Sequence, residues 1–296
     1  MFLSDKVLMI EPRGLTFNSQ TSQDNFFQSP GSIKAPVESA MREFHEMKKK
    51  LMKAGITVIV ISPDDELLTP DSVFPNNWFS TTPEGELILY PMMATNRRQE
   101  RRMDIISRLK KNYSKVIDLS SMEERQIYLE GTGSLILDHE NKIAYASISN
   151  RTNEEALQEW NKNKGYELIT FTSHDQNNKV IYHTNVMMAL GDGFAIACLD
   201  SIHDEKKRKL VKSKLEEKNE LLTISISQMH SFCGNCLELK NSNGEKFLIM
   251  STQAYNAFTE QQKSRLIIHT TIIHSNLSTI ETIGGGSARC MMAELF

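Results

Sequence analysis

The sequence predicts an α/β fold: a five-bladed α/β propeller closed by its N- and C-terminal strands. The first observation is a repeated order of β-hairpin, helix and strand, with a period of about fifty residues that is typical of repeat architectures. The hairpins begin near positions 78, 134, 186, 237 and 290. The second observation is that the last repeat stops after one hairpin strand (288–295), whereas the chain opens on a strand (7–12) that has no preceding partner. Pairing these two strands would complete a fifth unit and remove the open sheet edges.

The first repeat shows the local signals most clearly. The apolar run VLMIEP (7–12) is typical of a buried strand. Over 38–54, apolar residues recur at three- and four-residue spacing and Gly55 follows as a stop signal, which predicts an amphipathic helix. The β-branched run ITVIVIS (56–62) predicts a strand, and two strand-like runs around a Pro-Glu-Gly turn predict a hairpin over 76–92.

The later repeats carry the same signals in the same order. In chain order they predict helix 97–112, strand 115–120, hairpin 134–149, a helix from a cap near Asn153, strand 166–173, hairpin 186–198, helix 204–218, strand 222–227, hairpin 236–251, a helix with a Thr259/Gln262 capping box, and strand 269–275. This order requires mixed sheets with helices on the outside. A two-domain open α/β sheet is the alternative architecture.

Composition and charge exclude several classes of protein. The 296 residues carry a net charge of −3 and no cluster of basic residues, so nucleic-acid binding is not indicated. Long apolar windows and a signal-peptide pattern are both lacking, which predicts a cytoplasmic protein without a membrane segment. Four cysteines are too few for a disulfide framework. We expect a single domain over residues 1–296, and the sequence leaves a homo-oligomer open.

Polar residues stand at the same point of each repeat, in the linker before the hairpin. Because equivalent points of a propeller meet around one axis, these residues are expected to converge on one mouth. A thiol, an imidazole and a carboxylate brought together there are the minimum for nucleophilic catalysis. The residues concerned are Asn76 and Asn77, Glu130, His183 and Asn185, Cys233 and Cys236, and Cys290.

Cys290 is the candidate nucleophile because it follows three glycines, 284–286, whose backbone can approach a ligand closely. The alternative is a small apolar core residue on a terminal strand. His183 could equally be a core histidine, Glu130 a surface carboxylate and Asn185 a loop cap. Their shared register in the repeat favours the functional interpretation.

Four motifs resemble those of the guanidine-modifying, or pentein, superfamily of arginine deiminases, dimethylargininases and amidinotransferases. They are LEGTG (129–133), SNRTNEE (149–155), HTN (183–185) and GGGSARCM (284–291). More narrowly, FPNNWFST, HTNVMM, SFCGN and TIETIGGGSARCMMAE resemble the arginine-deiminase-related group that includes citrulline-utilisation hydrolases. The resemblance spans the whole chain and implies the pentein fold.

The resemblance also implies roles for individual residues. Cys290 would be the nucleophile, His183 the general acid/base and Glu130 its partner. Arg151 would bind the α-carboxylate of a small amino-acid substrate with a ureido or guanidino group, a task that suits its fork of donors. No metal or organic cofactor is implied.

Two positions depart from the family pattern: Asn77 and Asn185 stand where guanidine-binding members carry aspartates. Burying a guanidinium without a carboxylate is costly, whereas an amide offers a donor and an acceptor to a neutral ureido group. Citrulline is therefore the favoured substrate, with Asn76 as a further binding residue. Arginine or a dimethylarginine-like substrate is the alternative, which a carboxylate at Asp71 or Asp192 would support.

Other interpretations stay open. His230, Cys233 and Cys236 form an H-x-x-C-x-x-C pattern that could be half of a zinc site or a redox pair, although thiols lining the mouth or core are favoured. A propeller that only binds a small molecule or a partner protein is a non-catalytic alternative. The polar segment 13–31, with Asn18, Asn25 and Gln28, is a candidate lid.

Overall fold

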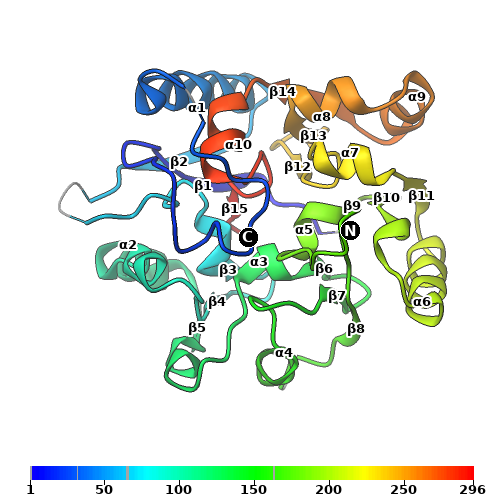
Figure 1. Cartoon of the computed structure of the whole chain (residues 1–296), viewed down its shortest axis with the longest axis horizontal. Coiled ribbons are helices and arrows are strands. Elements are labelled where there is room, and N and C mark those ends of the chain that lie inside the picture. Colours follow the sequence, from blue (N-terminus) through cyan, green and yellow to red (C-terminus); the bar gives the residue numbers. More distant parts are fainter. Residues whose placement is uncertain (1, 32, 65–66, 163) are drawn as a thin grey trace.

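The structure, a computed structural model, describes residues 2–31, 33–64, 67–162 and 164–296. Its strands form five sheets of three strands each. Figure 1 shows these small sheets arranged around a common centre, with the longer helices toward the periphery. The predicted five-bladed propeller is confirmed.

Each blade combines one antiparallel and one parallel pair of strands. In the first complete blade, β3 (Phe79–Thr81) and β4 (Glu86–Leu89) form the hairpin, and β5 (Lys115–Asp118) pairs parallel with β4. A parallel neighbour requires a crossover. The crossover contains α2 (Met103–Leu109), so the order hairpin, helix and strand follows from the sequence pattern.

The same topology recurs in the next three blades. Their strands are β6 (Ile136–Asp138), β7 (Ile143–Ser147) and β8 (Glu167–Phe171); β9 (Met188–Gly191), β10 (Phe194–Ala197) and β11 (Glu220–Thr223); and β12 (Leu237–Lys240), β13 (Lys246–Ser251) and β14 (Thr271–Ser275). Their crossover helices are α4 (Glu154–Asn161), α6 (Glu205–Glu216), α8 (Thr252–Ala257) and α9 (Glu260–His269). The capping box predicted for α9 is present: Thr259 accepts from the Gln262 backbone N–H, and the Gln262 side chain accepts from Thr259.

The fifth blade joins the two ends of the chain. The strand β1 (Lys6–Ile10) lies between β15 (Ala293–Glu294) and β2 (Thr57–Ile61). Val7 pairs antiparallel with Glu294 and Leu8 with Ala293. The predicted closure by the terminal strands is confirmed.

Helix α1 (Pro36–Lys53) shows how the apolar pattern sets the packing of the blades. Ala40, Phe44, Met47 and Leu51 recur at helical spacing, and all four are buried. The opposite face carries lysines and remains in solvent. The buried face contacts β14 and α10 (Ser278–Gly284), so the helix supports the segment that leads to Cys290.

Three local predictions were wrong in extent. The strand predicted over 288–295 shrinks to β15, because residues before it form turns in which the Cys290 N–H donates to the Ser287 carbonyl. The strand predicted over 222–227 ends at Thr223, because Ser225 caps a short helix, α7 (Ile226–His230), with a capping box. The helix predicted over 97–112 is interrupted between the 3₁₀ segment Thr95–Glu100 and α2.

The longest helices are amphipathic rather than apolar throughout. Within the described ranges, no helix has the length and apolar character needed to span a bilayer.

Candidate active site

One short helical turn precedes each of three hairpins, a feature that the sequence patterns did not predict. These turns are η1 (Pro75–Asn77), α3 (Gly131–Ser134) and α5 (Thr184–Met187). Figure 1 shows α3 and α5 side by side near the centre of the ring. Glu130 and His183 occupy the N-cap positions of α3 and α5, and Asn77 ends η1. The points that precede these three hairpins therefore lie at one mouth.

Cys290 lies in the turn between α10 and β15 rather than on a strand. The turn depends on Gly285, which has a φ of +65° that favours glycine, and an added Cβ there would lie 2.5 Å from Asn25 Nδ2. The thiol is buried, with two asparagine amides against it. Asn185 Nδ2 lies 3.3 Å and Asn235 Nδ2 3.2 Å from Cys290 Sγ, and both donate to the sulfur. Two amide donors therefore face the sulfur atom.

His183 and Glu130 form a buried pair, with 2.9 Å between Nε2 and Oε2. Burial lowers the pKa of His183, and the hydrogen bond with Glu130 opposes the shift. Burial would raise the pKa of Glu130, but two arginines and His183 outweigh it and lower that pKa to about 2. The pair is thus an ionised carboxylate that orients an imidazole, an arrangement suited to general acid/base work.

The imidazole fits because Gly133 has no side chain. A Cβ at Gly133 would lie 2.7 Å from His183 Nδ1 and 2.5 Å from Asn77 Nδ2. Such contacts are too short for any residue larger than glycine. The LEGTG motif therefore places the carboxylate of Glu130 and also leaves room for its partner.

Arg97 reaches the site from the 3₁₀ segment between the first hairpin and α2. Its Nη1 lies 2.7 Å from Asn77 Oδ1 and 4.0 Å from Glu130 Oε2. Its other nitrogens bond both oxygens of Glu100, each at 2.9 Å. Burial raises the pKa of Glu100 to about 7 even against the attraction of Arg97.

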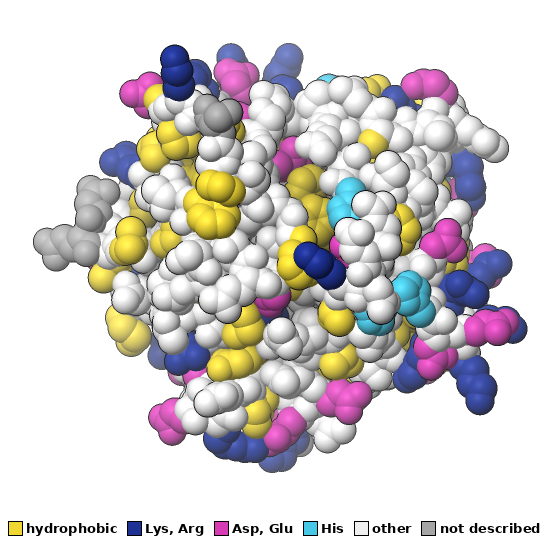
Figure 2. Space-filling model, in the orientation of Figure 1, with side chains coloured by type: hydrophobic (Ala, Val, Ile, Leu, Met, Phe, Trp, Pro, Cys, Tyr) yellow, Lys and Arg dark blue, Asp and Glu magenta, His cyan; other side chains and the backbone are white. Residues whose placement is uncertain are grey.

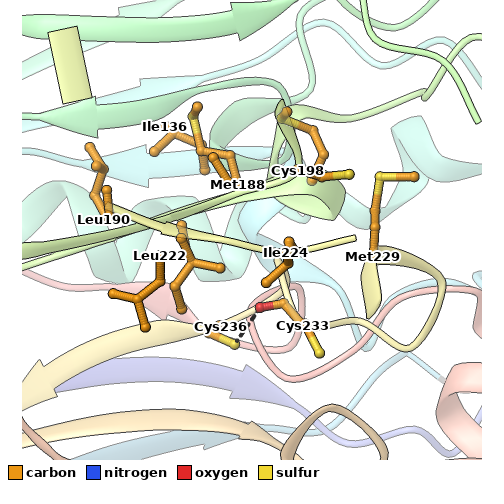
Figure 3. Close-up of a cluster of buried hydrophobic side chains, with 14 of the residues drawn as sticks. Ile136, Met188, Leu190, Cys198, Leu222, Ile224, Met229, Cys233 and Cys236 are labelled. Atoms are coloured by element: carbon orange, nitrogen blue, oxygen red, sulfur yellow. Dashed lines mark hydrogen bonds between the residues drawn. The ribbon is translucent and has the colours of Figure 1, made fainter. Parts of the chain in front are cut away.

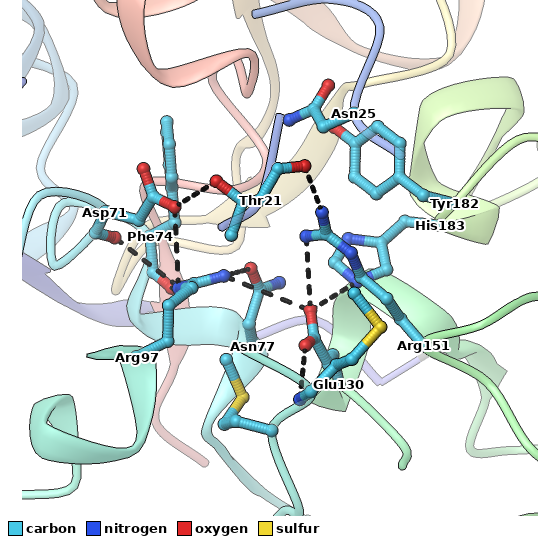
Figure 4. Close-up of polar contacts among 12 residues, drawn as sticks. Thr21, Asn25, Asp71, Phe74, Asn77, Arg97, Glu130, Arg151, Tyr182 and His183 are labelled. Atoms are coloured by element: carbon cyan, nitrogen blue, oxygen red, sulfur yellow. Dashed lines mark hydrogen bonds and ion pairs between the residues drawn. The ribbon is translucent and has the colours of Figure 1, made fainter. Parts of the chain in front are cut away.

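Arg151 approaches Glu130 from another direction. Its Nη1 lies 3.6 Å from Glu130 Oε2, and its guanidinium lies over the Tyr182 ring, 4.8 Å from the centroid. Figure 4 shows Arg97, Arg151 and His183 meeting on one oxygen of Glu130. The rest of the Arg151 fork is taken by the segment 13–31: Nε bonds both oxygens of Asp24, and Nη2 bonds Asp24 and the Thr21 carbonyl.

The segment 13–31 covers the mouth. Asn25 Nδ2 donates to the Gly285 carbonyl at 3.2 Å, and Gln28 Nε2 donates to the Gly284 carbonyl at 2.9 Å. Figure 1 shows this dark blue segment crossing the centre of the propeller, and Figure 2 shows most charged side chains of this face at its periphery. The structure therefore places the candidate lid directly over the glycine-rich turn.

Asp71 holds the segment 13–31 in place through two hydrogen bonds. Its Oδ2 accepts from Asn18 Nδ2 at 2.7 Å and from Thr21 Oγ1 at 2.9 Å. Burial raises the pKa of Asp71, and Arg97 opposes the shift. Asp71 thus lies in the site, whereas Asp192 pairs with Lys246 on another part of the surface.

A small cavity lies between the lid and the propeller. Its lining consists of Asn25, Asp71, Phe74, Asn77, Arg97, Arg151, Tyr182, His183, Gly284, Gly285, Gly286 and Cys290. Glu130 and Asn185 stand behind this lining, in contact with His183 and Cys290. Asn76 does not line the cavity: its Oδ1 accepts from Asn77 Nδ2 at 3.0 Å, so it supports Asn77 instead.

The structure adds residues that the sequence patterns missed. Asn235 belongs to the SFCGN motif, but only its contact with the sulfur shows what it does. Arg97 sits in a run of charged residues that resembles a solvated helix face. Tyr182 precedes His183 and donates its hydroxyl to the Gly285 carbonyl at 2.7 Å. No local pattern distinguishes Arg97 or Tyr182 from structural residues.

Cys233 and Cys236 do not join the candidate site. Figure 3 shows both thiols among Met188, Ile224 and other apolar side chains. Burial raises the pKa of Cys233 to about 12 and that of Cys236 well above its usual value. In the described part of the chain, no three or more His, Cys, Asp or Glu residues are grouped as a metal site would require. These positions favour the structural interpretation of the two cysteines.

The five α/β blades surround a mouth with a thiol, an imidazole, a carboxylate and two arginines. This arrangement defines a protein of the pentein superfamily, which includes the arginine-deiminase-related proteins. A family within the superfamily can also be named. Residues 11–296 match the model of the family described as N,N dimethylarginine dimethylhydrolase, eukaryotic, and the chain belongs to this family. The description of this family names the hydrolysis of N,N-dimethylarginine, a guanidino compound. Among curated proteins, none matches the sequence.

Solved structures show the same fold. The apo structure of ArgZ, an arginine dihydrolase from the ornithine-ammonia cycle in cyanobacteria, matches with a TM-score of 0.77 and 17% identity, over 97% of this chain and 40% of that chain. The product-bound N-terminal domain of ArgZ matches with a TM-score of 0.74 and 17% identity, over 98% and 97% of the two chains. A histidine-to-glycine variant of dimethylarginine dimethylaminohydrolase, as its adduct with S-methyl-L-thiocitrulline, matches with a TM-score of 0.68 and 16% identity, over 99% and 100%.

The chain thus spans 40% of the longer ArgZ chain and nearly the whole of the separate N-terminal domain. At such low identities these matches establish the fold alone.

Proposed function

We propose that the protein hydrolyses the ureido group of L-citrulline through a covalent intermediate on Cys290, giving ornithine, ammonia and carbon dioxide. The observation that carries this proposal is the pair of amides at the sulfur. Asn185 and Asn235 both donate to Sγ, and neither brings a charge to the reacting atom. Two uncharged amides at the reacting atom are suited to binding a neutral substrate.

Asn185 makes the case for a ureido group more specific. Its side-chain oxygen is buried and, among the described residues, has no hydrogen-bond donor. A buried acceptor without a donor costs free energy, which a substrate N–H would recover. The ureido group offers N–H donors to this oxygen, and its carbonyl oxygen can accept from amide N–H groups.

The proposed reaction has two stages. His183 takes the proton of the Cys290 thiol as the sulfur attacks the ureido carbon and forms a carbon–sulfur bond. One carbon–nitrogen bond then breaks as His183 gives that proton to the departing nitrogen. Water, deprotonated by His183, then cleaves the carbon–sulfur bond and restores the thiol. Whichever nitrogen leaves first, loss of the second nitrogen from the carbamate completes the release of ammonia, ornithine and carbon dioxide. No step requires a metal or an organic cofactor.

Binding of the amino-acid end completes the proposal. Arg151 would hold the α-carboxylate through its fork, and Asn77, fixed by Arg97 and Asn76, would contact the ureido end. Asn76 acts here only through Asn77.

Arginine is the second candidate substrate, because one buried carboxyl lines the cavity. Burial raises the pKa of Asp71, so a cation placed nearby would favour its ionised form and be stabilised in return. Arginine or a methylated arginine would then be cleaved at the guanidino carbon by the same thiol.

Product release from L-citrulline and L-arginine, measured side by side, tests the proposal. We expect ornithine and ammonia from citrulline with the native protein and none with Cys290→Ala. Citrulline formed from arginine would keep the nucleophile but overturn the argument from the asparagines. Ligand binding without any product, unchanged in Cys290→Ala, would favour the non-catalytic propeller.

An Asn185→Asp variant sharpens the choice of substrate. A carboxylate beside the sulfur should favour a guanidinium, so the ratio of kcat/KM for arginine to that for citrulline should rise by about tenfold. An unchanged ratio would show that Asn185 does not discriminate between a charged and a neutral substrate.

Several general features are also proposed rather than established. They are a single domain over residues 1–296, a cytoplasmic location, and action on a small amino acid with no nucleic-acid partner. A homo-oligomer is compatible with these features.

A further inference from the structure

We infer that Asp24 is a specificity-determining residue: its carboxylate occupies the Arg151 fork in the unliganded protein, and the substrate's α-carboxylate must displace it. The inference rests on the proposed function, in which Arg151 binds that α-carboxylate. It begins from the bonds of Arg151, whose side chain is 2% exposed.

Every nitrogen of the Arg151 guanidinium already has a partner. Nε lies 3.1 and 3.0 Å from the two oxygens of Asp24. Nη2 bonds Asp24 and lies 2.8 Å from the Thr21 carbonyl, and Nη1 faces Glu130 at 3.6 Å. Tyr182 covers the guanidinium face. The fork therefore has no free edge for a second carboxylate.

Asp24 is also the one acidic residue in the segment 13–31. Its side chain is 14% exposed, so it reaches Arg151 from the solvent side while the arginine stays buried. The α-carboxylate of an amino acid carries the same charge and the same pair of oxygens. Two identical groups compete for one fork, and both cannot use it together.

The competition explains how the buried arginine remains paired in both states. An unpaired guanidinium at this depth is strongly unfavourable, so Asp24 stabilises the empty site. A substrate with an α-carboxylate replaces that pairing when Asp24 leaves. A ligand without a carboxylate gains nothing from displacing Asp24, because it would leave Arg151 unpaired. Asp24 thus reduces the affinity for every carboxylate ligand and links its arrival to movement of the lid.

Replacing Asp24 by asparagine tests this inference without removing the side chain. We propose calorimetric titration of Cys290→Ala and of Cys290→Ala/Asp24→Asn with L-citrulline and with its decarboxylated analogue N-carbamoylputrescine. Arginine and agmatine form the corresponding cationic pair. The dissociation constant for citrulline should fall by about tenfold in the double variant, since a neutral amide competes less well for Arg151. That for N-carbamoylputrescine should change by less than about twofold.

Gln23→Ala provides the matched control, because Gln23 is the exposed neighbour of Asp24 on the same segment. It should leave both dissociation constants unchanged. Circular dichroism of Asp24→Asn confirms folding, and Asp24→Ser serves as a second variant if the first does not fold.

The outcomes separate the inference from the function on which it rests. Weaker binding of both ligands, or unchanged binding of citrulline, would overturn the inference and make Asp24 a simple latch of the lid. Failure of the citrulline and arginine pairs alike to bind Cys290→Ala would overturn the proposed function and this inference with it. Hydrogen exchange adds a readout that needs no ligand: residues 13–31 should exchange faster in Asp24→Asn, and an unchanged rate would also contradict the competition.

Discussion

Two cysteine sites stand near the hairpins of neighbouring blades, and their surroundings differ. Cys290 is buried, yet it lies against the amides of Asn185 and Asn235, which donate to its sulfur. Cys233 donates instead to the Ala254 carbonyl, and Cys236 packs beside it in an apolar cluster. Burial alone therefore does not separate a reactive thiol from a structural one. The partners of the sulfur do: amide donors face Cys290, whereas apolar side chains surround Cys233 and Cys236, and burial raises the pKa of both.

The largest effect is expected when the thiol of Cys290 or of Cys233 is removed. We expect Cys290→Ala to lower kcat with citrulline by at least about a thousandfold, because the covalent route disappears. Cys233→Ala should retain activity within about twofold, because that thiol touches no reacting group. Ammonia release under saturating substrate measures both. Equal losses in the two variants would show that the contrast between the two sites is not catalytic.

A smaller effect is expected from the carboxylate that orients His183. Glu130→Gln should lower kcat by about a hundredfold, because the imidazole loses its ionised partner. Glu130 also raises the pKa of His183 against burial, so its removal should lower that pKa further. The acid limb of the pH–rate profile should then move to lower pH, which a purely structural defect would not produce. A limb that moves upward, or stays in place, contradicts this role.

The same carboxylate contributes to stability with a definite sign. Its pKa in the folded protein is about 2, below the ordinary value of 4.5. The stability it contributes is therefore fully present above pH 4.5 and is lost as the pH falls toward 2. Urea unfolding of the native protein should show this decline below pH 4.5, and Glu130→Gln should show a shallower one. Identical pH dependence in the two proteins would contradict the ionised state of Glu130.

The smallest expected effect concerns reactivity toward iodoacetamide. Cys290 should be alkylated at least about ten times faster than Cys233 in the native protein, because the raised pKa of Cys233, about 12, leaves almost no thiolate. Peptide mapping by mass spectrometry measures the two rates. In urea the rates should converge, which serves as the control. Faster labelling of Cys233 in the native state would reverse the comparison.

Part of the fold could be predicted because its signals are local. The β-branched run ITVIVIS and the spacing of Ala40, Phe44 and Met47 each indicate one element, and the repeat order then indicates the ring. The predicted boundaries were wrong where a side-chain cap or a backbone turn ended an element early. Ser225 ended a strand by capping α7, and turns before β15 removed most of the strand predicted from 288.

For the site, the sequence likewise predicted the positions of the residues but not the directions of their side chains. Repeat register indicated Glu130, His183 and Cys290 because each stands at the start of a hairpin, and register is a property of the sequence. Asn76 stood at an equivalent position, but its side chain points to Asn77 and Thr132 and supports the lining from behind. The direction of a side chain depends on its neighbours, which the repeat does not specify.

The sequence by itself determined the five repeated units, the closure of the ring and the chemical groups at its mouth. Only the tertiary structure decided which groups touch. Arg97 leaves a charged run to reach Asn77, and Asp24 comes from more than a hundred residues away to fill the fork of Arg151. The physical reason is that buried charges must find partners, and those partners are chosen by the path of the folded chain rather than by local spacing.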